Sequence, residues 1–193
     1  MNQKDRIYNA KLFVLSGPSG VGKNAILAKL LKKIPDLKKV VTCTTRRRRP
    51  QEKEGLDHYF VSQKEFQKMI KENRFMEWAY VHKDYYGTLK EIVEKWLSQG
   101  KKRIMEIDVQ GALQIKKKIP SVVLIFIKPD SFANLFHRIA KRGKMSQADL
   151  KIRLEKSYRR EMALSKFYDY IIVNREGELN KAVERIKKII RRG

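Results

Sequence analysis

Short apolar segments alternate along the chain with longer segments in which apolar residues recur every three or four positions. The short segments are typical of strands buried in a parallel sheet, and they lie at residues 11–16, 40–42, 102–108, 122–127 and 170–173. The longer segments predict amphipathic helices at 25–34, 110–118, 131–142, from 146 onward and at 178–191. Because strands and helices alternate, the pattern predicts an α/β fold with a parallel sheet flanked by helices.

The middle of the chain departs from this alternation. Residues 44–56 are polar and charged, so we expect an exposed loop there. Two capping boxes, in which a hydroxyl residue is followed three positions later by glutamate, predict the starts of two helices: Ser62 with Glu65, and Thr88 with Glu91. These helices should end near Asn73 and Gln99, and the segment between them has mixed strand character. This middle part of the chain is therefore predicted to be an insert of α+β type.

A glycine-rich segment follows the first predicted strand and precedes the first predicted helix. It matches the motif GxxxxGK, whose backbone N–H groups surround phosphate oxygens while the lysine reaches the β and γ phosphates. The matching residues are Gly17, Pro18, Ser19, Gly20, Val21, Gly22 and Lys23. The alternative is a glycine-rich turn with an incidental lysine, but strand, loop and helix all fall where the motif requires them. The segment therefore predicts an ATP-binding phosphate loop.

The residue after the lysine departs from this motif. The motif ends in Ser or Thr, whose hydroxyl binds Mg²⁺, whereas this chain has Asn24. An amide oxygen can also be a ligand, but Mg²⁺ demands nearly octahedral geometry and the longer side chain moves the ligand atom. We therefore expect weaker metal binding, or a contact through water.

Composition narrows the class of protein. A chain of 193 residues with 42% hydrophobic content suits one compact domain. Cys43 is the only cysteine, so no internal disulfide can form, and no Cys/His metal cluster is suggested. The longest apolar run is too short to cross a bilayer and the polar start lacks the apolar core of a signal peptide. We expect a cytoplasmic protein with no membrane association.

The formal charge of +24 would attract nucleic acid, anionic membranes or phosphorylated small molecules. Most lysines lie among leucines and isoleucines at helical spacing, where they indicate solvated helix faces. The run Arg46–Arg49 is different, because two guanidinium groups three residues apart could hold one phosphate dianion. From this run alone, a phosphate site, nucleic-acid binding and a solvated loop all stay open.

Five further motifs occur in a specific order behind the phosphate loop. They are Thr44-Thr45-Arg46-Arg47-Arg48-Arg49, Glu54-Gly55-Leu56-Asp57-His58-Tyr59-Phe60, Phe75-Met76-Glu77-Trp78, Tyr85-Tyr86-Gly87-Thr88 and Glu106-Ile107-Asp108-Val109-Gln110-Gly111. Together they make the chain, from about residue 12 to 174, resemble the guanylate kinase family. The resemblance implies a P-loop NTPase core at about 10–42, 100–130 and 168–193, a GMP-binding insert at about 43–90 and a helical lid at about 131–166. It also implies transfer of phosphate from ATP to GMP with Mg²⁺, possible use of dGMP, and a monomer or homodimer.

The resemblance also implies roles for individual residues of the acceptor site. Arg46, Arg49 and Tyr86 would hold the GMP phosphate, Glu77 and Asp108 would accept hydrogen bonds from guanine N–H groups, and Thr42 and Thr88 would lie near the base. Guanine carries an N1 proton and a 2-amino group that adenine lacks, so a carboxylate can discriminate between the two bases. The alternatives from the residues alone are that Glu77 pairs with a lysine and that Asp108 caps the following helix.

On the donor side, the resemblance assigns a set of arginines and an asparagine to ATP. Lys23, Arg46, Arg49, Arg142 and Arg153 would stabilise the transferring phosphoryl group, Arg138 would stack on adenine, and Asn174 would lie near the adenine. Asn24 and Asp108 are the expected metal ligands, and Glu106 or Asp108 could also reach Mg²⁺ through water.

His58 departs from the family pattern, which has tyrosine directly after this aspartate. Tyr59 cannot take its place without a bulge, because successive side chains of a strand face opposite sides. We therefore expect His58 to contact the GMP phosphate, better when protonated, so that GMP affinity rises below about pH 6.5.

Three other functions stay open at this point. Guanylate kinase-like domains of scaffold proteins resemble the enzyme but bind phosphorylated peptides, and Asn24 keeps a catalytically weak binding module possible. The charge keeps a nucleic-acid-binding protein possible, although the motifs make nucleic acid an unlikely partner. A kinase acting on a phosphorylated sugar or another nucleotide is also conceivable, because a phosphate loop says nothing about the acceptor.

Overall fold

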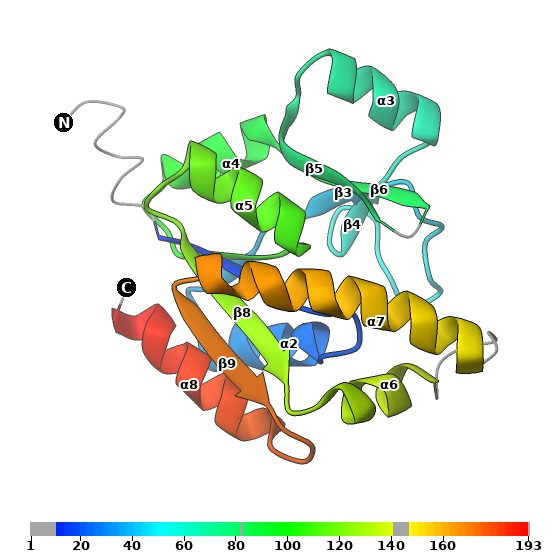
Figure 1. Ribbon diagram of the computed structural model, residues 1–193. Helices are drawn as coiled ribbons and strands as arrows, with labels where there is room; N and C mark the ends of the chain where they lie inside the picture. Colours follow the sequence, from blue (N-terminus) through cyan, green and yellow to red (C-terminus); the bar gives the residue numbers. More distant parts are fainter. Residues whose placement is uncertain (1–10, 82, 141–146, 193) are drawn as a thin grey trace.

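The computed structural model describes residues 11–81, 83–140 and 147–192, and it contains two sheets (Figure 1). The larger sheet is parallel throughout and has the strand order β2-β7-β1-β8-β9. Its strands are β1 (Leu12–Ser16), β2 (Lys38–Lys39), β7 (Arg103–Glu106), β8 (Val123–Pro129) and β9 (Tyr170–Asn174). The α/β fold with a parallel sheet flanked by helices is confirmed.

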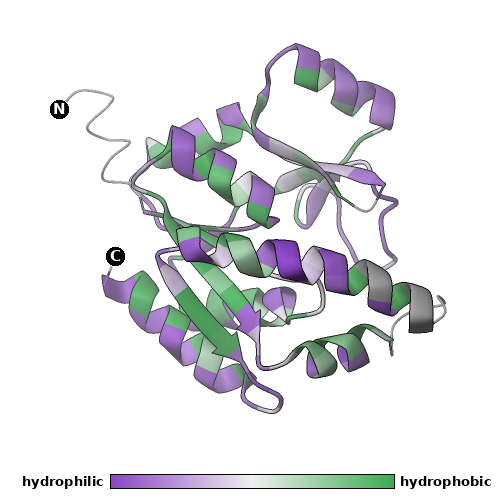
Figure 2. Cartoon of the chain, in the orientation of Figure 1, coloured by the Kyte–Doolittle hydropathy of each residue, from purple (hydrophilic) through white to green (hydrophobic). Residues whose placement is uncertain are grey.

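Both faces of this sheet are covered by helices, as the apolar strands require (Figure 2). Phe13 and Leu15 face α2 (Lys23–Lys33) and α8 (Leu179–Arg192), whereas Leu12 and Val14 face α4 (Lys90–Leu97) and α5 (Val109–Lys118). The alternation along β1 therefore divides the core into two layers. Helix α8 is visibly two-sided in Figure 2, with its apolar side toward the sheet.

The smaller sheet has the order β4-β3-β6-β5 and comes entirely from the middle of the chain. Its strands are β3 (Thr42–Thr44), β4 (His58–Phe60), β5 (Phe75–Val81) and β6 (Asp84–Leu89). Helix α3 (Gln63–Lys71) packs on it through Phe66, which stacks on Phe75. As predicted, Ser62 caps α3, since its Oγ accepts a hydrogen bond from the backbone N–H of Glu65.

Two predictions for this region are wrong. The strand expected at 40–42 is not formed as one element, because the chain leaves the larger sheet after Lys39, residues 40 and 41 lie between the sheets, and Thr42 begins a strand of the smaller one. Thr88 does not cap a helix: α4 starts at Lys90 and its N-cap is Leu89. The Thr88 hydroxyl donates instead to Glu77 of the neighbouring strand, at 2.6 Å, and Glu91 pairs with Arg74 at 3.2 Å. The cross-strand carboxylate thus outcompetes the local cap.

The C-terminal side of the chain adds α6 (Phe132–Ala140), α7 (Gln147–Leu164) and the 3₁₀ turn η1 (Ser165–Phe167). Ser131 accepts a hydrogen bond from the Asn134 N–H at 3.1 Å, so the predicted helix start there is confirmed. Arg142 lies outside the described residues. Arg153 lies on α7, but its side chain is not among those described. No helix among the described residues has the length and apolar character needed to cross a membrane.

Candidate functional site

The phosphate loop connects β1 to α2, and its backbone depends on glycine. Gly17, Gly20 and Gly22 have φ angles of 142°, 81° and 98°. A Cβ on Gly17 would collide with the carbonyl of Ile127 in β8, so the loop also passes too close to the sheet for any other residue. Lys23 begins α2, and its Nζ donates to the carbonyl of Gly17 at 2.6 Å and to that of Pro18 at 3.1 Å. The helix N-terminus and the lysine therefore face the same concavity.

Asn174 supports this loop from behind. Its side chain is only 4% exposed, and its Nδ2 donates to the carbonyl of Val21 at 2.8 Å. A Cβ on Gly22 would lie 2.7 Å from the same Nδ2. Asn174 ends β9, and the contact of its side chain is with the loop backbone. The position near adenine that the resemblance implies for Asn174 stays a prediction.

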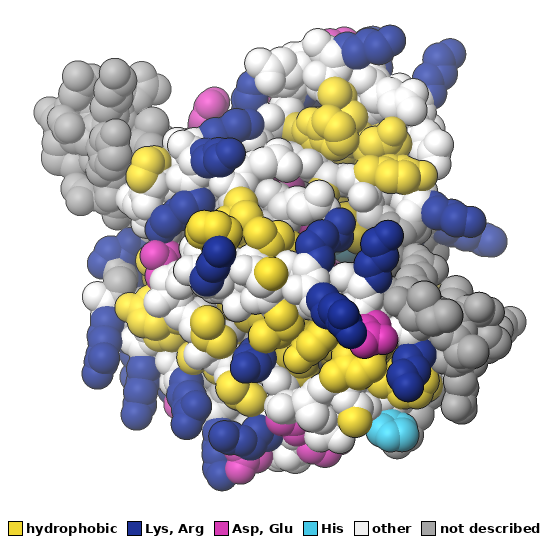
Figure 3. Space-filling model, in the orientation of Figure 1, with side chains coloured by type: hydrophobic (Ala, Val, Ile, Leu, Met, Phe, Trp, Pro, Cys, Tyr) yellow, Lys and Arg dark blue, Asp and Glu magenta, His cyan; other side chains and the backbone are white. Residues whose placement is uncertain are grey.

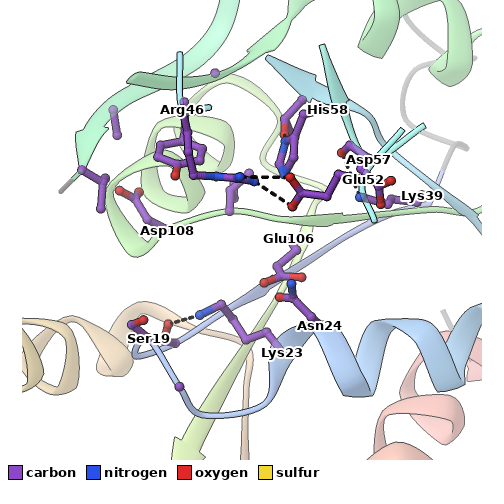
Figure 4. A pocket seen from close by; sticks show the side chains of 18 of the residues that line it. Ser19, Lys23, Asn24, Lys39, Arg46, Glu52, Asp57, His58, Glu106 and Asp108 are labelled. Atoms are coloured by element: carbon purple, nitrogen blue, oxygen red, sulfur yellow. Dashed lines mark hydrogen bonds and ion pairs between the residues drawn. The ribbon is translucent and has the colours of Figure 1, made fainter. Parts of the chain in front are cut away.

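Asn24 faces Glu106 at the end of β7 (Figure 4). With its amide nitrogen toward the carboxylate, Asn24 donates to both oxygens of Glu106, at 2.8 Å for Oε2. Burial raises the pKa of Glu106, while Lys23 and Lys39 act in the opposite direction. The residue that replaces the motif hydroxyl is therefore linked to the carboxylate expected near the metal.

A cavity of about 610 Å³ separates the phosphate loop from the smaller sheet. This volume is within the range of small-ligand sites. In Figure 4, Ser19, Lys23 and Asn24 lie on one side, and Arg46, His58 and Glu52 lie on the other. The structure thus brings together residues from the phosphate loop, from β3 to β6 and from the start of α5. Predicted site residues that line the cavity are Gly17, Ser19, Gly20, Gly22, Lys23, Asn24, Thr42, Arg46, Arg49, His58, Glu77, Tyr86, Glu106 and Asp108.

The arginine run meets a carboxylate that the sequence analysis did not select. Glu52 receives a bidentate hydrogen bond from Arg46, at 2.8 and 2.9 Å, and a third bond from the backbone N–H of Arg49 at 2.9 Å. The Arg46 hydrogen bond lowers the pKa of Glu52 to about 2. The sequence feature that could have identified Glu52 is its position three residues after Arg49 in a turn. Glu52 holds the Arg46 guanidinium at the cavity wall, which is where a phosphate-binding group is needed.

Glu77 and Asp108 approach the cavity from different elements. Glu77 is 3% exposed and pairs across the strands with Thr88, whose hydroxyl donates to it. Burial raises the pKa of Glu77 to about 7, with opposing contributions from Thr88 and Lys118 and a further increase from Asp108. Asp108 is the N-cap of α5 and accepts from the Gly111 N–H at 2.7 Å through Oδ1, while its buried Oδ2 has no partner among the described residues. The capping alternative for Asp108 is therefore correct, yet one oxygen stays available.

His58 lies opposite Thr42 in the parallel pair of β3 and β4, and its Nδ1 is 2.8 Å from the Thr42 Oγ1. Burial lowers the pKa of His58 to about 4, and the charges of Lys39 and Arg46 lower it further than Glu52 and Asp57 raise it. A pKa near 4 means that the ring of the unliganded protein is largely neutral between pH 5.5 and 7.5. Because a bound phosphate dianion raises the pKa of a neighbouring imidazole, the expectation that protonation of His58 strengthens GMP binding below about pH 6.5 stays a prediction.

Three more polar residues line the cavity without having been predicted: Lys39, Asp57 and Glu161. Lys39 ends β2, and its Nζ donates to the carbonyl of Asp57 at 2.9 Å, which links the larger sheet to the turn before β4. Glu161 comes from α7, and burial raises its pKa while Lys23 opposes the rise. Only long-range packing places them here, so no local signal could have found Lys39 or Glu161.

Arg138 lies on α6, away from these residues. Its guanidinium pairs with Glu176, with Nη2 at 2.6 Å and Nε at 2.7 Å from Oε2. Arg138 therefore connects α6 to the loop after β9, beside the segment that carries Asn174.

Comparison with known proteins agrees with this arrangement. The family model described as Guanylate kinase matches residues 9–193. This chain belongs to the guanylate kinase family.

Relatives in the guanylate kinase family cover nearly the whole chain. The chain is 44% identical to a guanylate kinase of Thermotoga maritima, over 94% of this chain and 86% of that protein. It is also 44% identical to a guanylate kinase of Caldanaerobacter subterraneus subsp. tengcongensis, over 93% and 85% of the two chains. The crystal structure of guanylate kinase from Anaplasma phagocytophilum superposes with a TM-score of 0.74 at 32% identity, covering 94% of this chain and 85% of that one. The resemblance predicted from the motifs is confirmed.

The oxygen donors at the loop suit the Mg²⁺ that the family implies. Asn24, Glu106 and Asp108 offer only oxygen ligands, and Asp108 keeps a buried oxygen without a partner among the described residues. Within the same residues there is no group of three or more His, Cys, Asp or Glu side chains that could hold a metal ion alone. The unpartnered oxygen of Asp108 suits an ion that keeps several waters and binds substrate phosphates.

Proposed function

We propose that this chain transfers the γ-phosphoryl group of ATP to GMP and forms ADP and GDP. The main support for the proposal is that a phosphate loop and a buried glutamate, Glu77, line the same cavity. A nucleoside-monophosphate kinase needs a donor site and an acceptor site that face each other. We use "donor side" for residues 17–24 and Glu106, and "acceptor side" for the cavity wall formed by β3 to β6 and Asp108.

On the donor side, the loop N–H groups and Lys23 bind the phosphates of ATP. Asn174 keeps the loop in shape through Val21, so its contribution to ATP binding passes through the backbone. Asn24, Glu106 and Asp108 would hold Mg²⁺, with Glu106 oriented by the Asn24 amide. When bound, Mg²⁺ neutralises phosphate charge and aligns the reacting groups. We assign adenine stacking to Arg138 and charge stabilisation during transfer to Arg142 and Arg153 of the predicted lid.

On the acceptor side, Glu77 and Asp108 accept the guanine N–H groups. Thr88 already donates to one oxygen of Glu77, so the carboxylate is oriented before the base arrives. Thr42 lies beside His58 at the same wall. Adenine would leave these acceptors without donors, and a buried acceptor without its donor costs roughly 1–3 kcal/mol. Discrimination against AMP therefore follows from the chemistry of this wall.

The phosphate of GMP is held by Arg46, Arg49 and Tyr86, with Glu52 orienting Arg46. His58 contributes as a neutral ring. If the Thr42 hydroxyl donates to Nδ1, the proton of His58 resides on Nε2 and can be donated to the acceptor. These cations and N–H donors neutralise charge during the transfer, and no covalent intermediate with the protein is required.

A coupled assay of ADP formation tests the proposal directly. The protein is supplied with ATP, Mg²⁺ and each of GMP, dGMP, AMP, CMP and UMP in turn. Turnover with GMP and dGMP alone is expected, because the acceptors on the wall face the base. Turnover with a different nucleotide alone would show that GMP is not the acceptor substrate. No turnover with any of them at saturating Mg²⁺ would favour a binding module, and Asn24 would then mark the loss of catalysis.

On the face shown in Figure 3, the distribution of charge does not favour a second function. Figure 3 shows lysine and arginine side chains spread over the displayed face, on both the larger and the smaller sheet's helices, and not gathered into one track. Such a spread is typical of solvated helix faces. The division into core, insert and lid, the cytoplasmic location and the monomeric or homodimeric state stay predictions.

A further inference from the structure

Helix α5 packs along β5, which is one of the two outer strands of the smaller sheet (Figure 1). An outer strand presents backbone groups that no neighbouring strand pairs. Here the side-chain amide of Gln114 takes the place of a strand. Its Nε2 donates to the carbonyl of Trp78 at 2.9 Å, and its Oε1 accepts from the N–H of Trp78 at 3.3 Å.

A second side chain of the same helix holds the same strand. Lys118, one turn further along α5, donates through Nζ to the carbonyl of Met76. Met76 and Trp78 are the neighbours of Glu77 in β5. The backbone on both sides of Glu77 is therefore bound to one helix.

The first turn of α5 is close to the Glu77 side chain as well. A Cβ on Gly111 would collide with Oε2 of Glu77, so the carboxylate lies directly against the helix backbone. Gly111 also donates its N–H to Asp108, at 2.7 Å. The first turn of α5 thus contacts both carboxylates of the acceptor side, those of Glu77 and Asp108.

We propose that Gln114 and Lys118 are positioning residues for base recognition, because together they bind β5 to α5 and keep Glu77 at a constant distance from Asp108. The inference rests on the proposed function and deepens it. Neither residue lines the cavity. The effect of Gln114 therefore passes through the backbone of β5, whereas Lys118 also acts on Glu77 through its charge. Both should influence acceptor specificity without influencing the donor side.

The test replaces Gln114 with methionine, which has similar length but neither bond. We expect the KM for GMP to rise about fivefold to tenfold, since two neutral hydrogen bonds are lost. The KM for ATP and kcat should stay within about twofold. The preference for GMP over inosine monophosphate, which lacks the 2-amino group, should fall as well. Gln67→Met, on exposed α3, is the matched control and should behave as the wild type.

Lys118→Met is the second variant, with Lys117→Met as its control on the same helix. Lys117 is exposed, unlike the helix face that carries Ile115. Lys118→Met should raise the KM for GMP in the same direction as Gln114→Met. Thermal unfolding of each variant verifies that it is folded before its kinetics are compared. If one variant fails to fold, the other still tests the proposal.

A double-mutant cycle separates positioning from general loosening. In a Glu77→Gln background there is no longer a carboxylate to position, so adding Gln114→Met should change the KM for GMP by less than about twofold. An equal effect in both backgrounds would overturn the proposal, and so would a folded Gln114→Met protein with an unchanged KM. Wild-type turnover with GMP is measured first and reports on the proposed function alone. A wild type that turns over GMP, with unaffected variants, overturns only the positioning role.

Discussion

The donor side draws all its polar groups except Glu106 from one continuous segment, residues 17–24, whereas the acceptor side draws them from β3, β4, β5, β6 and the start of α5. On the donor side, three glycines with positive φ and a helix N-terminus create the concavity locally. On the acceptor side, cross-strand and helix-to-strand contacts create it, as between Glu77 and Thr88. The shape of the phosphate site is therefore set mainly by local backbone conformation, with support from Asn174, whereas the base site depends throughout on contacts between elements that are remote in the sequence.

The largest effect is expected from Lys23→Met on the donor side. The lysine faces the loop concavity, so its loss removes a charge from the transferring phosphate and should lower kcat by roughly 10²–10³. The KM for GMP should change little, because the acceptor side is built separately. Steady-state kinetics with both substrates varied measure this, and Lys32→Met on the exposed face of α2 is the control. A rise in the KM for GMP as large as the fall in kcat would contradict the independence of the two sides.

The next effect is expected from Glu77→Gln on the acceptor side. The change removes two charge-assisted acceptor positions, so kcat/KM for GMP should fall roughly 10²–10³. The KM for ATP should remain unchanged. Because the carboxylate is buried, the variant should be no less stable than the wild type in urea at pH 8. Glu94→Gln, at an exposed site on α4, is the control, and equal losses in the two variants would refute the assignment.

A smaller effect is expected from Glu52→Gln. The amide cannot accept the bidentate bond of Arg46, so the guanidinium loses its fixed orientation. We expect the KM for GMP to rise about tenfold, with the KM for ATP unaffected. If the KM for GMP instead falls, Glu52 competes with the substrate phosphate and does not orient Arg46.

A still smaller effect should appear in the pH profile. The pKa of Glu77 is raised to about 7, and guanine donors require the ionised form. The KM for GMP should therefore fall by about fivefold to tenfold between pH 6 and 8. The same group makes the free energy of unfolding decrease as pH rises from about 4.5 through about 7, since the folded state holds this proton more tightly. Glu77→Gln provides the baseline for titration of GMP itself, and an identical profile in the variant would exclude Glu77 as the cause.

The smallest effect is expected from Asn24→Ser, which restores the motif hydroxyl and removes the hydrogen bonds to Glu106. The Mg²⁺ concentration for half-maximal activity should fall about threefold, and Mn²⁺ binding followed by electron paramagnetic resonance should tighten in parallel. An unchanged metal titration would show that Asn24 is equivalent to the hydroxyl.

Much of the site could be predicted, and the errors have physical causes. The phosphate loop was identifiable because its function depends on local backbone conformation, which Gly17, Gly20 and Gly22 encode. Thr88 was assigned to a helix cap because a capping box is a local pattern, yet its hydroxyl binds Glu77 across the strands. The pKa of His58 in the unliganded protein cannot be predicted from the sequence, because it depends on burial and on Lys39 and Arg46, which belong to other parts of the chain.

The order of the main strands and helices, the phosphate loop and the family can be predicted from the sequence alone, because periodicity and glycine positions are local properties and the order of motifs is read directly along the chain. Tertiary structure alone decided that Glu52 holds Arg46, that Asn24 binds Glu106 and that α5 holds β5 beside Glu77. The energy of each of these contacts depends on how deeply its residues are buried and on how far apart they lie. Burial and distance are both set only when the two sheets come together around the cavity.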